Sequence, residues 1–484
     1  MTTIPIDWSA IAPELVLLGV ACVVLIVGIF VPPMAQRPFA AIMAAGGFVA
    51  AMCVAASQFH NDPTYAFAHT LRIDSFGQAG RIVVYGSGLL AVLLAWGMPW
   101  LRTRTIEFYT LLLVAAGGMS MLAICNSFVT MFVALELFSI CLYILVAIDV
   151  DRLSSLEAGL KYLVVGGIGA AMLLYGASLV YGTTGQLQFD GIAAAIRLGD
   201  ANDAVLLTGL ALLLAGLAFK ANAAPFHMWT PDAYEGAPTP ITGFMSAATK
   251  IAALVIAFRV LTTAFPQEHE LWQNVLAGLA VASFAVGNIA ALRQTDVKRM
   301  LAYSTIGQTG FLLTAVAAGT PLGAQALIFY LVVYALMNLG AFAVVAIRER
   351  ELERPATIDD FRGYAYRRPV LSVAMVVFML SLAGIPPTAG FLGKLYVFSA
   401  AAGADLTWLA LVGAVATMVA LVYYLRIPLA VIDREARVPV ARLRPGFATA
   451  GLVAVVAMVA VVGFFVFPNG LTQFAKDAGA SLFQ

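Results

Sequence analysis

The sequence predicts an all-α membrane protein that crosses the bilayer about fourteen times. The first observation behind this prediction is composition, since 62% of the 484 residues are hydrophobic and only 11% are charged. Soluble proteins carry about 25% charged residues. The second observation is that apolar runs of roughly 20 residues, the length that spans a bilayer, recur along the whole chain. The predicted spans start near Ile11, Pro38, Asp74, Thr105, Asn126, Ser155, Asn202, Pro238, Trp272, Asp296, Leu322, Pro369, Asp405 and Pro445.

These spans form one membrane domain over residues 1–484, because no stretch of soluble-domain length interrupts them. The N-terminal segment MTTIPIDWSAIAPELVLL has no basic residue before its apolar run. It therefore predicts a first membrane span and not a removable signal. The connections 58–72 and 186–201 are long, and we expect each to carry a short piece of structure at the membrane interface.

Basic residues are divided unevenly between the two sides of the membrane. Alternate connections hold Arg37, Arg102, Arg104, Arg152, Arg293, Lys298 and Arg299, and later the segments RERELERPATIDDFRGYAYRRP and DREARVPVARLRP. The opposite connections hold little beyond Arg72, Arg197 and Lys476. Positive residues concentrate on the cytoplasmic side, so both termini are expected on the periplasmic side. The charged connections set the topology on this interpretation; docking of a partner is the alternative.

Several chemistries have no support in the sequence. The net charge of +1 gives no overall field for nucleic acid. Cys22, Cys53, Cys125 and Cys141 lie singly in apolar runs, which favours neither disulfides nor an iron–sulfur site. The segment GGIGAAMLLYG lies inside a predicted span, so it indicates small-residue helix packing and not a dinucleotide site. No phosphate loop, haem motif or metal-ligand cluster is present, and we expect this chain to bind no metal and no cofactor.

Two predicted spans are interrupted. The seventh breaks at FKANAAPF, where Pro225 follows Lys220, and the twelfth breaks at LAGIPPTAGFLGKLYVF, where Pro386 and Pro387 precede Lys394. Broken spans at corresponding places in two halves are typical of inverted-repeat transporters, whose sites lie near the midplane. The sequence therefore predicts two inverted repeats, helices 4–8 and 9–13, with helices 7 and 12 broken. These halves cover residues 105–261 and 272–432.

Ionisable side chains inside the membrane are expected to have a structural or functional role, because inserting each one at a helix centre costs about 2.5–3.5 kcal/mol of free energy. Arg81 lies close to a span start, so we expect it to extend toward the interface. Lys161 has a similar position, and for it both an interfacial and a functional role stay open. Glu136, Lys220 and Lys250 lie nearer mid-span and are harder to explain in this way.

The mid-span charges can be interpreted in two ways. They form either a static ion pair that locks helices together or a proton relay, since membrane-embedded Glu and Lys residues are common in pumps. A buried carboxylate beside buried lysines couples their protonation states. His227 follows Pro225 at the first break and is either a hydrogen-bonded structural residue or a further relay group.

At this point the sequence resembles the antiporter-like membrane subunits of respiratory complex I, and among them the N type of the bacterial proton-pumping NADH:quinone oxidoreductase. The resemblance covers nearly the whole chain. It rests on APELVLLG, ALELFSICLYILVA, KANAAPFHMWTPDAYEGAPTPITGFMSAATKIAAL and LAGIPPTAGFLGKLYVF. The L and M types tend to have LPDAHVEAPTP in place of TPDAYEGAPTP, and M types tend to have glutamate at the Lys394 position.

The resemblance implies a role for each charged residue. Glu136 and Lys220 would be the coupled pair, Lys250 the central relay and Lys394 the terminal lysine, while Lys161 would modulate the relay from the cytoplasmic side. The chain would be a translocase subunit without redox chemistry of its own. NADH, flavin, iron–sulfur clusters and quinone would be bound by partner subunits. Those partners would include neighbouring M-type and K/J-type subunits and the lateral helix of the L-type subunit, in the bacterial inner membrane.

Two other functions stay open from the sequence. An Mrp-type cation/proton antiporter subunit, driven by ion gradients, would share the Glu and Lys positions. A purely structural membrane subunit would hold its charges as inert ion pairs. An intramembrane enzyme has less support, because the sequence offers no nucleophile or metal constellation.

Overall fold

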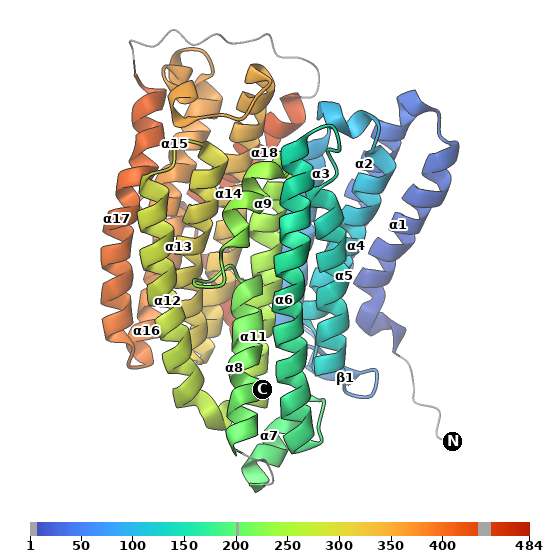
Figure 1. The fold of residues 1–484 in the computed structure, drawn as a ribbon, viewed down its shortest axis with the longest axis vertical. Helices are drawn as coiled ribbons and strands as arrows, with labels where there is room; N and C mark the ends of the chain where they lie inside the picture. Colours follow the sequence, from blue (N-terminus) through green and yellow to red (C-terminus); the bar gives the residue numbers. More distant parts are fainter. Residues whose placement is uncertain (1–6, 200–202, 434–446) are drawn as a thin grey trace.

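The protein, described here from a computed structural model over residues 7–199, 203–433 and 447–484, is a bundle of long, roughly aligned helices (Figure 1). Within these residues, thirteen helices are long and apolar enough to cross a membrane. A further apolar span is split into two shorter helices, so the prediction of about fourteen spans is confirmed. The chain is a multi-pass membrane protein. The predicted starts at Asn202 and Pro445, and residues 434–445 of the last basic segment, lie outside the described residues.

The first six spans are regular helices that follow each other along the chain. After the short turn η1 (Trp8–Ile11) they are α1 (Ala12–Phe30), α2 (Pro33–Ser57), α3 (Ser75–Ala95), α4 (Thr105–Ala123), α5 (Phe128–Val146) and α6 (Leu153–Thr184). The turn η2 (Pro99–Arg102) lies between α3 and α4.

The later spans include two that are broken and one that contains a π-helical turn. They are α8 (Asp203–Lys220) with α9 (Trp229–Gly236); α10 (Thr239–Phe244), the π turn η3 (Met245–Thr249) and α11 (Lys250–Ala264); α12 (His269–Leu292) after η4 (Pro266–Glu268); α13 (Val297–Ala318); α14 (Pro321–Leu352); α15 (Pro369–Ala383) with α16 (Ala389–Gly403); α17 (Thr407–Val431); and α18 (Phe447–Val466). The turns η5 (Ile358–Phe361) and η6 (Tyr364–Tyr366) precede α15, and α19 (Asn469–Ser481) ends the chain.

The two long connections carry local structure, as predicted. The first forms an antiparallel hairpin of β1 (Thr64–Ala66) and β2 (Leu71–Ile73), and the second forms the short helix α7 (Phe189–Leu198). Both connections are fixed to the turn between α4 and α5. The Arg72 amide donates to the Ile124 carbonyl at 2.8 Å, and the Phe128 amide donates to the Leu187 carbonyl at 3.0 Å.

The first and last described helices end on the same side of the bundle. Gln58 donates to the carbonyl of Ser9 at 2.8 Å, and Arg72 donates to the carbonyls of Ser481 and Leu482 at 3.1 and 3.3 Å. Figure 1 shows this side to be the one that also carries the hairpin and α7. Whether it faces the periplasm stays a prediction from the charge distribution.

Small residues let α6 pack closely on α8, which positions the first break. A Cβ on Gly176 would lie 2.7 Å from the Gly209 carbonyl oxygen, and a Cβ on Gly169 would lie 2.5 Å from the ring of Phe219. The helices can approach this closely only because these positions have no side chain. The packing interpretation of GGIGAAMLLYG is therefore confirmed, and Phe219 is held beside Lys220.

The expectation that Arg81 extends to the interface is wrong. Its side chain is fully buried, and Nη2 lies 2.7 Å from Oε2 of Glu14 in α1. The Ser120 hydroxyl donates to the other Glu14 oxygen at 2.8 Å, and the Tyr85 hydroxyl donates to it at 3.3 Å. Glu14 is 67 residues away from Arg81 in the sequence. The position of Arg81 near the start of α3 therefore could not indicate this partner.

A second buried charge cluster joins the hairpin to α11. Asp74, at the start of α3, accepts two hydrogen bonds of 2.7 Å from Arg259, and Arg72 Nε lies 3.1 Å from the same carboxylate. Both partners of the Arg259–Asp74 pair have fully buried side chains. The sequence did not predict Arg259 as an ionisable residue inside the membrane.

Removing one partner of a buried ion pair should destabilise the subunit strongly. Glu14→Leu would leave the Arg81 guanidinium uncompensated in the core, at a cost of about 3–5 kcal/mol. We expect less assembled protein in membranes and a lower midpoint of thermal unfolding in detergent, with partial recovery in Glu14→Leu/Arg81→Met. Arg104→Met is the matched control, because the Arg104–Glu107 pair is about half exposed and such pairs contribute about 1 kcal/mol or less. Equal losses in both variants would contradict this account.

Candidate functional site

The first break follows the geometry of a Schellman helix end. Asn222 adopts a left-handed φ of 61°. The Ala223 amide donates to the Ala218 carbonyl at 2.9 Å, and the Asn222 amide donates to the Phe219 carbonyl at 3.2 Å. These are the two hydrogen bonds of that motif, and they leave the Ala221 carbonyl without an intrahelical partner.

The second break repeats this geometry. Gly384 has a left-handed φ of 80°. The Ile385 amide donates to the Leu380 carbonyl at 2.9 Å, and the Gly384 amide donates to the Ser381 carbonyl at 3.0 Å. Ala383 therefore corresponds to Ala221 as the residue at the helix cap. The two spans predicted to be broken are both broken, in the same way.

A buried lysine binds the free carbonyl at each break. Lys250 Nζ donates to the Ala221 carbonyl at 3.2 Å, and Lys394 Nζ donates to the Leu382 and Ala383 carbonyls at 3.0 and 3.2 Å. The C-terminus of a helix carries the negative end of its dipole, so an ammonium group is favoured there. The two half-helix ends are thus cation sites filled by lysine.

The helix α13 connects the two breaks through adjacent residues. The Thr309 hydroxyl donates to the Ala221 carbonyl at 3.0 Å and is hydrogen-bonded to Lys250 Nζ. Gln308 Nε2 donates to the Leu382 carbonyl at 2.8 Å. Lys250 Nζ also donates to the Thr305 carbonyl at 2.9 Å. One helix thereby contacts the groups around both lysines.

Tyrosines extend the same network. The Tyr334 hydroxyl donates to the Thr305 hydroxyl at 3.2 Å, and the Tyr330 hydroxyl donates to the Gln308 amide oxygen at 2.5 Å. Gln308 Nε2 also donates to the Tyr424 hydroxyl, which is hydrogen-bonded to Ser304 at 2.5 Å. All of these side chains are buried. The network is therefore a polar layer enclosed by the bundle.

Lys220 lies at the other side of the first break and contacts α5. Its Nζ donates to the Ser139 hydroxyl at 2.8 Å, and its side chain is almost fully buried. Ser139 is one turn from Glu136 on the same helix. Within the described residues, Glu136 and Lys220 form no ion pair, and one buried Glu136 oxygen has no hydrogen-bond partner. Of the coupled pair that the sequence predicts, Lys220 is therefore hydrogen-bonded to α5 at a position one turn from Glu136.

Lys161 and His227 lie apart from this chain of contacts. Lys161 is about half exposed and pairs with Glu157 at 2.7 Å and with Asp232 of α9 at 3.1 Å. Asp232 also pairs with Arg299 at 3.1 Å, which makes Lys161 part of a surface ion-pair group. His227 lies in the segment between α8 and α9, and its Nδ1 has no partner in the part of the chain that the structure describes.

The sequence interpretation missed the hydroxyl and amide groups that surround the lysines. They share a recognisable pattern, since Thr305, Gln308 and Thr309 are polar residues three and four apart within the apolar span that contains YSTIGQTGFLL. Such spacing puts them on one face of a helix. The π turn before Lys250 was also missed, and no residue type in MSAAT would have indicated it.

Comparisons with known proteins give the family. A family model described as NADH:quinone oxidoreductase/Mrp antiporter, TM, matches residues 125–420, a segment that contains both breaks and the site. A protein of Chloroflexus aggregans named NADH-quinone oxidoreductase subunit N is 42% identical over 432 residues, covering 88% of each chain. This chain belongs to the family of NADH-quinone oxidoreductase subunit N.

Solved structures agree with membership of the subunit N family. A chain of respiratory complex I from Thermus thermophilus, solved with bound aureothin, matches with a TM-score of 0.81 and 34% identity, over 95% of this chain and 98% of that one. A chain of the Mrp complex from Dietzia matches with a TM-score of 0.82 over 98% of each chain, but at 20% identity. That second likeness shows a shared fold alone.

Proposed function

We propose that this chain is a membrane-arm subunit of a proton-pumping NADH:quinone oxidoreductase, and that it carries protons through Glu136, Lys220, Lys250 and Lys394. It acts as part of a translocase and performs no redox chemistry itself. NADH, flavin, iron–sulfur clusters and quinone belong to its partner subunits. The observation that carries this proposal is the buried polar network between the two breaks, in which Lys250 and Lys394 bind freed helix-end carbonyls and Thr309 and Gln308 of α13 contact both ends.

The contacts suit stepwise proton transfer. Lys220 donates to Ser139, one turn from Glu136 on α5, and the Ala221 carbonyl, next in the chain to Lys220, holds Lys250. Thr309 and Gln308 lead from Lys250 to the carbonyls that hold Lys394. An ammonium that gives up its proton becomes an amine that can accept one from a hydroxyl or a water. The fixed carbonyls keep Lys250 and Lys394 in place while hydroxyls and bound water carry the proton between the lysines.

The position of Glu136 supports a neighbouring subunit at α5. Glu136 is partly exposed, and it is flanked on α5 by the exposed apolar residues Val133, Leu137 and Ile140. A carboxylate facing lipid is costly, so a partner that supplies a polar or basic group would cover it. In our proposal this partner is a K/J-type or M-type subunit, and the lateral helix of the L-type subunit crosses elsewhere on the surface.

The proposal also includes the orientation of the chain in the membrane and roles for Lys161 and His227. The arginine-rich side faces the cytoplasm and both termini face the periplasm of a bacterial inner membrane, as the loop charges favour. Lys161 modulates the relay from the cytoplasmic side, through its ion pair with Asp232 of α9. His227 is a further relay group in this proposal, since its Nδ1 has no partner among the described residues and is available to water or to a partner subunit.

Affinity purification in mild detergent tests the proposed assembly. The tagged chain should co-purify with NADH-oxidising subunits, and the preparation should reduce a quinone with NADH. Co-purification with cation-antiporter subunits instead, with sodium-driven proton movement and no NADH oxidation, would support the Mrp-type alternative and contradict the proposal.

A further inference from the structure

An apolar groove lies on the surface of the bundle between α4, α5 and α6, toward the arginine-rich end. Its volume is about 720 Å³. The residues that line it are mostly apolar, and they include Ile140 and Ile144 of α5 and Leu160 and Leu163 of α6, each 49–62% exposed. A hollowed apolar surface of this kind on a membrane-spanning bundle is covered by lipid or by another protein.

Close packing of α5 on α6 closes the bottom of the groove. A Cβ on Gly159 would lie 2.6 Å from Cβ of Ala147, and a Cβ on Gly166 would overlap the hydroxyl of Tyr143. Tyr143 lines the groove, and its ring centre lies 6.0 Å from Nζ of Lys220. The groove therefore ends against a ring that also lies beside the lysine of the first break.

The groove has the length of a lipid acyl chain within one leaflet of a bilayer. It extends along α5 from Ile148 to Ile140, which is about 12 Å at about 1.5 Å per residue. The hydrocarbon core of a bilayer is about 30 Å thick, so one leaflet contributes about 15 Å. A single chain that lies along α5 and α6 would therefore cover the groove.

Two opposite charges lie beside the groove, where α4 begins. Arg104 and Glu107 line it, and their side chains are 45% and 50% exposed. Nη1 of Arg104 lies 3.7 Å from Oε1 of Glu107, which is longer than a hydrogen bond. Both groups can therefore bind a ligand. A phosphate would accept from the guanidinium and a primary ammonium would donate to the carboxylate, each in a charge-assisted hydrogen bond.

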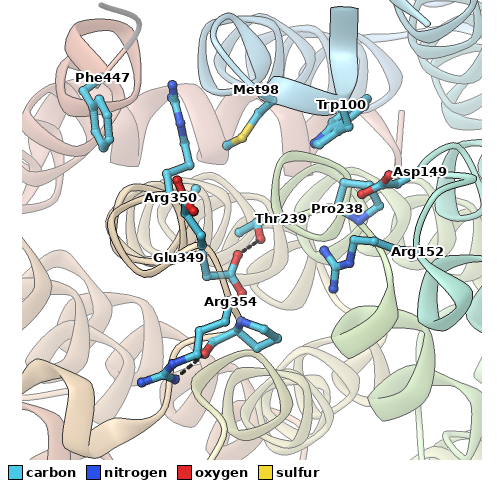
Figure 2. Close-up of a pocket in the computed structure, with 13 residues that line it drawn as sticks. Met98, Trp100, Asp149, Arg152, Pro238, Thr239, Glu349, Arg350, Arg354 and Phe447 are labelled. Atoms are coloured by element: carbon cyan, nitrogen blue, oxygen red, sulfur yellow. Dashed lines mark hydrogen bonds between the residues drawn. The ribbon is translucent and has the colours of Figure 1, made fainter. Parts of the chain in front are cut away.

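A second pocket at the arginine-rich end has a different character. It has a volume of about 490 Å³ over the start of α10 and the end of α14, and Figure 2 shows Glu349 hydrogen-bonded to Thr239 inside it. Arg354, which also lines it, donates to the Pro355 carbonyl at 3.0 Å and pairs with Asp360 at 2.6 Å. These charges have close partners within the protein, unlike the separated pair at Arg104.

We propose that the groove is a specific site for phosphatidylethanolamine, with one acyl chain along α5 and α6 over Tyr143, the phosphate on Arg104 and the ammonium on Glu107. This headgroup carries one negative and one positive charge, which matches the pair, and its ammonium has hydrogens to donate. Phosphatidylcholine has the same charges but no hydrogen on its nitrogen, and phosphatidylglycerol has no cation for Glu107. The site does not depend on proton transfer, so the inference goes beyond the proposed function.

Photocrosslinking in the assembled complex tests this site. The complex is reconstituted in phosphatidylcholine proteoliposomes with a trace of phosphatidylethanolamine that carries a diazirine in one acyl chain, and labelled peptides are identified by mass spectrometry. We expect label on residues 140–148 and 156–163, at least about fivefold more than with phosphatidylcholine or phosphatidylglycerol probes of the same chains, since each of these lacks the hydrogen bond to Glu107. Glu107→Gln should reduce this preference to less than about twofold.

Leu160→Trp fills the groove from an exposed position and should lower the label at least about fivefold. The matched control is Leu174→Trp, at an exposed leucine of the same helix outside the groove, which should change it less than about twofold. Lys250→Met should label as wild type, so a failure of the proposed relay would leave this result unchanged. Equal labelling by the three probes would indicate unselective surrounding lipid, and no label on either segment would indicate a protein partner over the groove. Either result would overturn the site.

Discussion

Lys250→Met should lower NADH-driven proton pumping to about 1% of the wild-type rate or less, while the complex still assembles. The reason is that a group that transfers a proton contributes roughly 100-fold or more to the rate. Lys250 is fully buried and is held by the Ala221 and Thr305 carbonyls and by Thr309. Methionine fills a similar volume without a charge, and Thr309 can still donate to Ala221. The break at the first half-helix should therefore survive the substitution.

The matched control for this variant is Thr314→Val. Thr314 is buried on α13, the helix that also carries Thr305 and Thr309, but its hydroxyl donates to the Gly310 carbonyl of its own helix, at 2.8 Å. We expect pumping within about twofold of wild type in this variant. NADH oxidation with a soluble electron acceptor should be unchanged in both variants, since that chemistry lies in partner subunits. Normal pumping in assembled Lys250→Met complex would remove Lys250 from the relay.

The sequence was most informative where a residue type conflicts with its surroundings. Pro225, and Pro386 with Pro387, interrupt the backbone hydrogen bonds of a membrane helix, and the lysine near each break is costly at that depth. Both breaks were predicted for this reason, and the mid-span positions of Glu136 and Lys250 followed from the same conflict with apolar neighbours. The long connections were predictable too, because their length exceeds what a simple turn requires.

The partners of these charges could not be predicted from the sequence. Periodicity tells which residues lie within one helix, but not which other helix lies opposite. Arg81 therefore seemed interfacial, although its partner Glu14 lies 67 residues away, and Arg259 pairs with Asp74 across 185 residues. The hydrogen bond of Lys220 to Ser139 of α5, one turn from Glu136, was hidden in the same way.

The correspondence between the two halves was also only partly visible. The sequence showed two breaks but almost no similarity between FKANAAPF and LAGIPPTAGFLG. The structure shows the same helix end at both, with a left-handed residue and a buried lysine on the freed carbonyl. Backbone geometry is shared although side chains are not, because Asn and Gly both tolerate a positive φ. The exact limits of the halves, 105–261 and 272–432, stay a prediction.

The measurement that tests the central claim most directly is NADH-driven acidification of membrane vesicles that carry Lys220→Ala, with assembled complex quantified and NADH:quinone turnover followed in parallel. Lys220 lies at the first break, and among the described residues its ammonium donates to Ser139 of α5, one turn from Glu136. Lys476→Ala, which removes an exposed lysine from α19, is the control for loss of charge. If complex assembles but pumping and coupled turnover fall at least about tenfold, Lys220 carries protons as proposed. If both stay near wild type, Lys220 is structural and the relay described here is wrong.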